Sequence, residues 1–205
     1  MKNRINVLIL VVAASAILTA CSGDEKESVT TDILKDTTVD KPIENNTEEV
    51  SFVTISPQVI NEAEELEQTY ESDSFFMGIT GEWEHKGESS IDFFGIEGKA
   101  VEMSIVPDVS GMTESLEECK TQLCMLYNDM EGYEVISVGD ITLNGREGIV
   151  INYKFEKGDS IYQGRQLVVQ YDNVFYVITF LSLQDEFADY EEDVMKMIST
   201  FKIKQ

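Results

Sequence analysis

The sequence contains a single histidine, His85, and only three cysteines among 205 residues. One histidine excludes a metal site built from several histidines, and no motif places His85 beside a cysteine or serine nucleophile. The sequence also has no glycine-rich phosphate loop, no Gly-x-Ser-x-Gly motif and no Cys or His set at metal-ligand spacing. These absences argue against catalysis, and they predict no catalytic residue, no cofactor and no bound metal.

Positively charged residues are scarce as well. The sequence has 15 Lys and Arg residues and 39 Asp and Glu residues, which gives a net charge of −24. Such a field repels phosphate polymers and anionic headgroups, so it disfavours nucleic acid and direct adsorption to lipid, and we expect no nucleic-acid partner. The simplest interpretation is that excess carboxylate keeps an exported domain soluble. A cationic partner or a site for divalent ions is the alternative.

The first twenty residues have the three parts of a secretion signal. Lys2 and Arg4 form a positive start, residues 7–17 are apolar, and residues 18–20 form a small-residue cleavage site. The apolar stretch from Ile5 to Ala20 has sixteen residues, which is shorter than the roughly 20 that cross a hydrocarbon core. Residues 1–20 are therefore predicted to be a signal peptide and not a membrane span.

The residues Leu18-Thr19-Ala20-Cys21 resemble the lipobox of bacterial lipoproteins. The resemblance implies that the Cys21 sulfur carries a diacylglyceryl group and that signal peptidase II cuts just before it. Two acyl chains on one residue give lasting attachment. We therefore expect lipidation at Cys21, a membrane partner held through this lipid anchor, and a location on the extracytoplasmic face of the cell membrane. Loss of Lys2 and Arg4 changes the net charge from −24 to −26.

The mature chain divides into two parts. Residues 21–50 contain Cys21 followed mostly by Thr, Asp, Glu, Lys and Asn without an apolar period, which predicts a disordered acidic tether. Residues 51–205 contain no internal repeat and are predicted to form one α+β domain. Cys119 and Cys124 lie five positions apart in a predicted helix, too far apart for a disulfide. The domain must therefore rely on its core for stability.

Three helices are predicted from caps and apolar spacing. The first begins at Ser56-Pro57 and carries a stripe of Val59, Ala63, Leu66 and Tyr70. The second begins at a Ser115 and Glu118 capping box. The third is capped by Ser182, and its apolar stripe is Phe187, Tyr190, Val194, Met197 or Ile198, and Phe201.

Strands are predicted where short apolar or alternating runs meet turn residues. Three runs cover residues 75–80, 91–96 and 99–106, with Glu97-Gly98 between the last two. Two hairpins follow, one of residues 133–143 and 146–155 around Asn144-Gly145, the other of residues 161–171 and 174–181 around Asp172-Asn173. Residues 174–181 are apolar on both faces, which predicts a central strand covered by helices on each side.

This order of elements resembles a known family. The Ser-Leu-Glu-Glu helix at 115–118, the Asn144-Gly145-Arg146-Glu147-Gly148 hairpin, the strand at 175–180 and Ser199-Thr200-Phe201-Lys202-Ile203 resemble small lipoproteins with the fold of the photosystem II extrinsic subunit P, a fold shared by DcrB-like lipoproteins. The resemblance covers about Phe75 to Ile203. It implies an α+β fold with an antiparallel sheet sandwiched between helices and, for most members, no known chemistry. The family's proline-x-x-tryptophan is replaced here by Gly81-Glu82-Trp83.

Few residues stand out as binding candidates. Trp83 and His85, with Phe75 and Phe76 nearby, form the aromatic cluster that could line a binding surface, although aromatic residues near a strand are more often core. Cys119 and Cys124 are interpreted as buried packing residues. The acidic run at 185–193 lacks the glycine turn of a calcium loop and is predicted to be a solvated helix face.

The leading hypothesis is a membrane-anchored, non-catalytic binding or accessory module for an unknown protein or small molecule. One alternative is an envelope enzyme whose site is assembled from residues distant in sequence. The other is an acidic protein that binds divalent cations.

Overall fold

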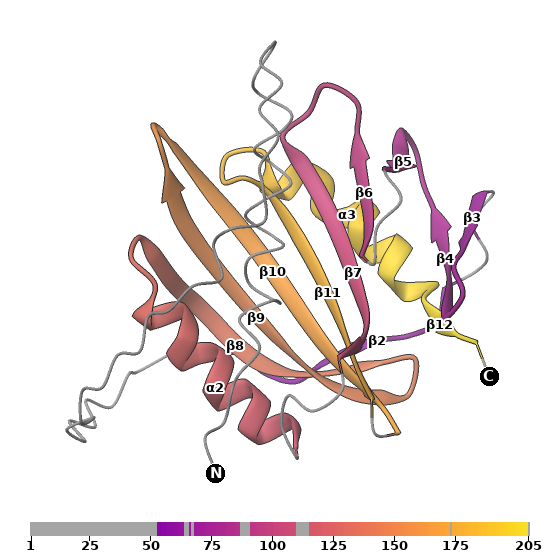
Figure 1. Cartoon of the computed structure of the whole chain (residues 1–205), viewed down its shortest axis with the longest axis horizontal. Helices are drawn as coiled ribbons and strands as arrows, with labels where there is room; N and C mark the ends of the chain where they lie inside the picture. Colours follow the sequence, from indigo (N-terminus) through magenta and orange to yellow (C-terminus); the bar gives the residue numbers. More distant parts are fainter. Residues whose placement is uncertain are drawn as a thin grey trace, which may run out of the picture.

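The computed structural model describes residues 53–63, 66, 68–86, 91–109, 115–172 and 174–204. The predicted signal peptide, Cys21 and the tether lie outside these residues. Within them the chain forms a nine-stranded sheet, a three-stranded sheet and two helices, so the predicted α+β fold is confirmed (Figure 1).

The large sheet has the order β1-β8-β9-β10-β11-β7-β6-β5, and β2 also pairs with β8. Its strands are β1 (Val53–Thr54), β2 (Gln58–Ile60), β5 (Trp83–His85), β6 (Asp92–Ile96), β7 (Val101–Val109), β8 (Tyr133–Leu143), β9 (Arg146–Lys157), β10 (Ser160–Tyr171) and β11 (Val174–Leu183). Every pairing is antiparallel except that β1 and β2 run parallel to β8. The small sheet has the order β12 (Lys202–Ile203), β4 (Phe75–Ile79) and β3 (Gln68–Glu71).

The two helices cover opposite faces of the large sheet. Side chains of β11 alternate between the two cores, because Ile178 and Phe180 pack with helix α3 (Phe187–Ser199) and Val177 and Leu181 pack with helix α2 (Leu116–Asp129). All but the end residues of β11 are buried. The predicted central strand between helical layers is confirmed.

The predicted first hairpin is confirmed at its turn. Asn144 and Gly145 have φ angles of 49° and 79°, the left-handed region that this tight turn requires. The Asn144 side chain then donates hydrogen bonds to the carbonyl oxygens of Ser199 and Phe201, and its backbone N–H donates to Ile60. One turn therefore joins β8, the end of α3 and β2.

Helix α2 begins as its sequence predicts. The Ser115 hydroxyl accepts a hydrogen bond from the backbone N–H of Glu118 at 3.2 Å, which is one half of a capping box. Neither Cys119 nor Cys124 forms a disulfide within the described residues, and both are buried against the sheet. Burial raises the pKa of the Cys124 thiol to about 11, so this thiol is protonated and unreactive at neutral pH.

Two helix predictions are wrong. Residues 58–60 and 68–71 form β2 and β3 instead of a helix starting at Ser56-Pro57, because β8 and β4 offer strand edges that these residues pair with. Ser182 does not cap the last helix, because β11 continues along β10 and buries Ser182 completely. Helix α3 instead starts at Phe187, after Glu186, with no side-chain cap.

Candidate functional site

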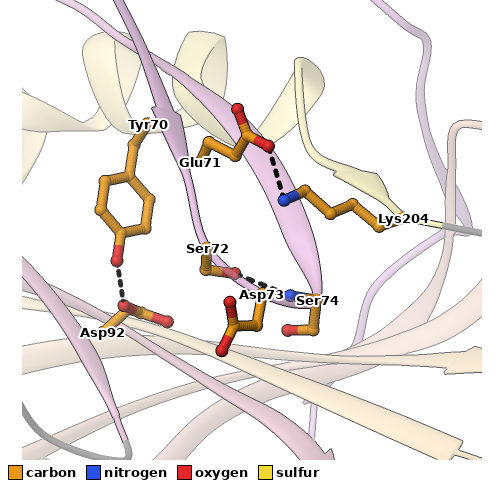
Figure 2. Close-up of a pocket in the computed structure, with 7 residues that line it drawn as sticks. All are labelled: Tyr70, Glu71, Ser72, Asp73, Ser74, Asp92 and Lys204. Carbon is orange, nitrogen blue, oxygen red and sulfur yellow. Dashed lines mark hydrogen bonds and ion pairs between the residues drawn. The ribbon is translucent and has the colours of Figure 1, made fainter.

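A polar cleft lies between the small sheet and the β5–β6 end of the large sheet, where Tyr70 of β3 meets Asp92 of β6 (Figure 2). Its volume is about 600 Å³. It is lined by Tyr70, Asp92 and Lys204 and by the β3–β4 turn, residues 71–74. The cleft is therefore assembled from segments that are far apart in the sequence.

The turn that forms one wall is shaped by Ser72. Its hydroxyl oxygen accepts hydrogen bonds from the backbone N–H groups of Ser74 at 3.2 Å and Phe75 at 3.1 Å. A serine that binds its own turn in this way fixes the backbone locally. Asp73 occupies the exposed tip, and its carboxylate faces the same open space as Asp92 (Figure 2).

Tyr70 and Asp92 also line the cleft, and His85, which is outside the lining, contacts both of them. The Tyr70 hydroxyl donates a hydrogen bond to Asp92 Oδ1 at 2.5 Å, and His85 Nε2 lies 3.2 Å from the same oxygen. The Tyr70 and His85 rings are stacked with centroids 4.3 Å apart. Since both contacts use Oδ1, Asp92 Oδ2 has no hydrogen-bond partner among the described residues.

Tyr70 is held in its neutral form. Burial, then the hydrogen bond to Asp92, and then the negative charges of Asp92 and Asp73 raise the pKa of Tyr70 to about 12. At physiological pH the phenol is therefore a fixed hydrogen-bond donor to Asp92.

Lys204 is the cation that lines the cleft, and it is already paired. Its Nζ lies 2.6 Å from Glu71 Oε1 and 4.8 Å from the centre of the Phe76 ring. With three carboxylates, from Glu71, Asp73 and Asp92, and one amine, the lining carries net negative charge. The arrangement suits a ligand that offers hydrogen-bond donors or a positive charge.

No family model matches this chain, and no curated protein matches it. Solved structures do resemble it. LpqN of Mycobacterium tuberculosis, described as involved in cell envelope biogenesis, aligns with a TM-score of 0.51 and 14% identity over 64% of this chain and 83% of LpqN. At this identity the likeness shows a shared fold alone.

Two other structures align less closely. The cyanobacterial PsbP (CyanoP) of Synechocystis sp. PCC 6803 has a TM-score of 0.49 and 15% identity over 67% of this chain and 92% of its own. A Pseudomonas aeruginosa protein of unknown function, PA94, has a TM-score of 0.45 and 12% identity over 61% of this chain and 99% of its own. A PsbP is thus among the structural neighbours of this α+β fold.

The structure places the two predicted binding residues differently. His85 lies beside the cleft through its contacts with Asp92 and Tyr70. Trp83 is only 2% exposed and packs in the core, with its ring edge-on to Tyr190. No ligand is present to test either residue, so binding by Trp83 and His85 stays a prediction.

Sequence reasoning missed the other cleft residues. The apolar spacing places Tyr70 on the stripe of a predicted helix, and Asp92 belongs to a different strand 22 positions away. No local spacing links them, because their contact depends on how the small sheet packs on the large one. The one available signal was the turn chemistry of Ser72-Asp73-Ser74.

Within the described parts of the chain, no three His, Cys, Asp or Glu residues are grouped closely enough to hold a metal ion. The acidic face of the last helix is solvated as predicted, since Asp185, Asp189 and Glu192 are exposed. No helix among the described residues is long and apolar enough to span a membrane.

Proposed function

We propose that this chain is an extracytoplasmic lipoprotein whose folded domain is a non-catalytic binding module, and that the Tyr70–Asp92 cleft is its binding site. The anchor rests on the signal peptide and on Cys21 at the lipobox position. The envelope role described for LpqN, which shares the fold, supports the same location.

One observation carries the binding role. Asp92 is oriented from one side by Tyr70 and His85 through a single oxygen, while its second oxygen has no partner among the described residues. A carboxylate held rigidly in this way at an open cleft is prepared to accept a ligand donor, because its orientation costs no further side-chain entropy. The ligand class that fits is a polar molecule or protein segment with hydrogen-bond donors.

A photo-cross-linking experiment in the native envelope tests this proposal. A photoreactive phenylalanine replaces Ser74, which lines the cleft, in the full-length chain. We expect a defined cross-linked species that disappears when Tyr70→Phe and Asp92→Asn are added. Asp189→Asn, an exposed acid on α3, removes the same charge elsewhere and should leave the species intact.

Two results would contradict the proposal. One is the absence of any cross-linked species at position 74 under conditions where the probe is incorporated and the protein is lipidated. The other is an adduct whose yield is the same with and without Tyr70 and Asp92. A probe at Asp159, in the β9–β10 turn outside the cleft, provides the background level.

The His85–Asp92 contact also supports a second candidate, an envelope enzyme that uses acid–base chemistry. A histidine beside a carboxylate at a cleft is a common acid–base arrangement. The structure favours binding, because the Ser72 hydroxyl that could act as a nucleophile is engaged by the backbone of its own turn. Chemical alteration of the cross-linked partner that depends on His85 would favour the enzyme.

A further inference from the structure

Strand β3 is one of the two outer strands of the small sheet, on the side of β4 away from β12 (Figure 1). Among the described residues it pairs only with β4, and Gln68, Thr69 and Glu71 are exposed. An edge strand presents backbone N–H and C=O groups that another extended chain can pair with. The edge of β3 is therefore a surface with hydrogen-bonding capacity beyond its own sheet.

The hairpin register identifies which residues of β3 point outward. Ser72 N–H donates to the Phe75 carbonyl at 3.0 Å, so these two residues form a hydrogen-bonded pair that closes the turn. Hydrogen-bonded and non-hydrogen-bonded pairs alternate along an antiparallel ladder, which makes Tyr70 and Met77 the next bonded pair. The backbone groups of Thr69 and Glu71 therefore point away from β4.

A second hollow lies at the Thr69 end of this edge. It has a volume of about 310 Å³ and is lined by mainly apolar side chains, including Leu66 and Phe76. Leu66 packs closely over Gly78, where an added Cβ would lie 2.9 Å from the Leu66 Cβ. Thr69 lines this hollow and Tyr70 lines the polar cleft. These adjacent side chains of β3 therefore lie on opposite faces of the strand.

Charge then restricts what can bind along this edge. Asp73 and Asp92 lie at the cleft end, and the amine of Lys204 is already paired with Glu71. The chain as a whole carries a net charge of −24. Complementary charge speeds association and excludes like-charged partners, so a basic segment is favoured over an acidic one.

We propose that β3 binds an extended basic peptide segment of a partner protein as an added strand. The peptide backbone pairs with Thr69 and Glu71, a Lys or Arg side chain enters the cleft beside Asp73 and Asp92, and an aliphatic side chain enters the apolar hollow. Strand addition of this kind combines backbone hydrogen bonds with pockets for alternate side chains. The inference rests on the proposed binding role of the cleft and names the class of partner.

Calorimetry with synthetic peptides tests the inference on the full-length lipidated chain in nonionic detergent. The probe is the capped pentapeptide Lys-Val-Lys-Val-Lys, whose alternation sends lysines and valines to opposite sides. We expect binding that weakens about tenfold when the amides facing β3 are N-methylated, because backbone donors are removed while side chains are kept. The Glu-Val-Glu-Val-Glu counterpart should not bind.

Protein variants locate the bound peptide. Asp92→Asn should lower the affinity for the pentapeptide about tenfold, whereas Asp189→Asn should leave this affinity unchanged. Thr69→Pro removes an N–H that points away from β4, a position where an edge strand tolerates proline, so the variant should fold normally and lose the peptide. If the Thr69→Pro variant does not fold, the comparison of the parent and N-methylated peptides alone tests whether the peptide pairs with β3.

Equal binding of the parent and N-methylated peptides, binding of the acidic counterpart, or no binding of the parent peptide would overturn the inference. These outcomes are separable from failure of the proposed function. If the Ser74 cross-link depends on Asp92 but the peptide does not bind as an added strand, the proposed binding role of the cleft is retained and only the peptide partner is rejected. If the purified chain binds the peptide but no cross-linked species forms in the native envelope, the cleft has no ligand in that envelope and the proposed function is overturned.

Discussion

The backbone N–H of Gly78 donates a hydrogen bond to the Thr200 hydroxyl at 2.7 Å, although 122 positions separate the two residues. The same hydroxyl donates to the Met197 carbonyl at the end of α3. Thr200 therefore ties the last helix to β4, the middle strand of the small sheet that carries one wall of the cleft. The position of that wall depends on this buried contact.

Replacing Thr200 should weaken the fold. Thr200→Val keeps the shape of the side chain but leaves the buried Gly78 N–H without its acceptor, which costs about 1–3 kcal/mol of unfolding free energy. Thr200→Ser keeps the hydroxyl and should therefore lower the unfolding free energy by less than Thr200→Val does. Chemical denaturation of both variants measures the difference, and equal midpoints for Val and wild type would contradict the assigned bond.

The tight turn at Gly145 gives a second prediction. Gly145 has a φ of 79°, so Gly145→Val forces a β-branched residue into the left-handed region and should destabilise the fold by about 1–3 kcal/mol. Gly145→Asn is the matched control, because asparagine tolerates this conformation. Thermal unfolding that gives the same midpoint for the Val and Asn variants would be evidence against a strained turn.

Glu102 should make stability depend on pH. Burial raises its pKa from 4.5 to about 7, with a smaller opposing effect from Lys86. Because the folded pKa is the higher one, its contribution to stability is complete below pH 4.5 and is lost as pH rises towards 7.

Glu102→Gln removes this ionisation. It should therefore stabilise the protein at pH 8 by roughly 2–3 kcal/mol and change little at pH 4. Unfolding midpoints across this range measure the effect, with Glu147→Gln, an exposed residue on β9, as the control for net charge. A Glu102→Gln protein that keeps the full pH dependence of wild type would show that another group is responsible.

Divalent cations should act on this protein only through screening. Asp189 and Glu192 of α3 are exposed at helical spacing, so calcium and magnesium at equal ionic strength should shift the melting temperature equally. A dedicated site would instead raise stability by about 2.7 kcal/mol at a hundredfold excess over Kd. A calcium-selective shift abolished by Asp189→Asn with Glu192→Gln would establish cation binding.

Lipidation gives the fifth prediction. Cys21→Ala should leave the precursor without acyl label and uncut by signal peptidase II, because that enzyme acts on the lipid-modified cysteine. Metabolic labelling with a fatty acid, followed by gel analysis of the precursor and mature forms, measures both effects. Unchanged acyl labelling of the variant would exclude Cys21 as the lipid site, while Cys119→Ala serves as a control for the loss of a thiol.

Local chemistry was sufficient for several elements. Asn144-Gly145 specifies its turn because both residues accept positive φ, and the flanking alternation then sets the register of β8 and β9. Ser115 and the apolar spacing that follows specify α2 in the same way, since a cap and a periodic face act within a few turns of chain. These signals need no knowledge of the rest of the molecule.

Other elements depended on partners that no local pattern reveals. The spacing of Val59, Ala63, Leu66 and Tyr70 fits a helix, yet β8 and β4 supply edges whose hydrogen bonds outweigh that weak preference. Tyr70 and Asp92 meet only because the small sheet packs against the β5–β6 end of the large sheet. The sequence by itself thus determined the hairpins and α2, whose interactions are short-range, and it marked β11 as central because a run that is apolar on both faces must be buried on both. Only the tertiary structure decided the cleft, because its walls come from segments brought together by burial of a common core.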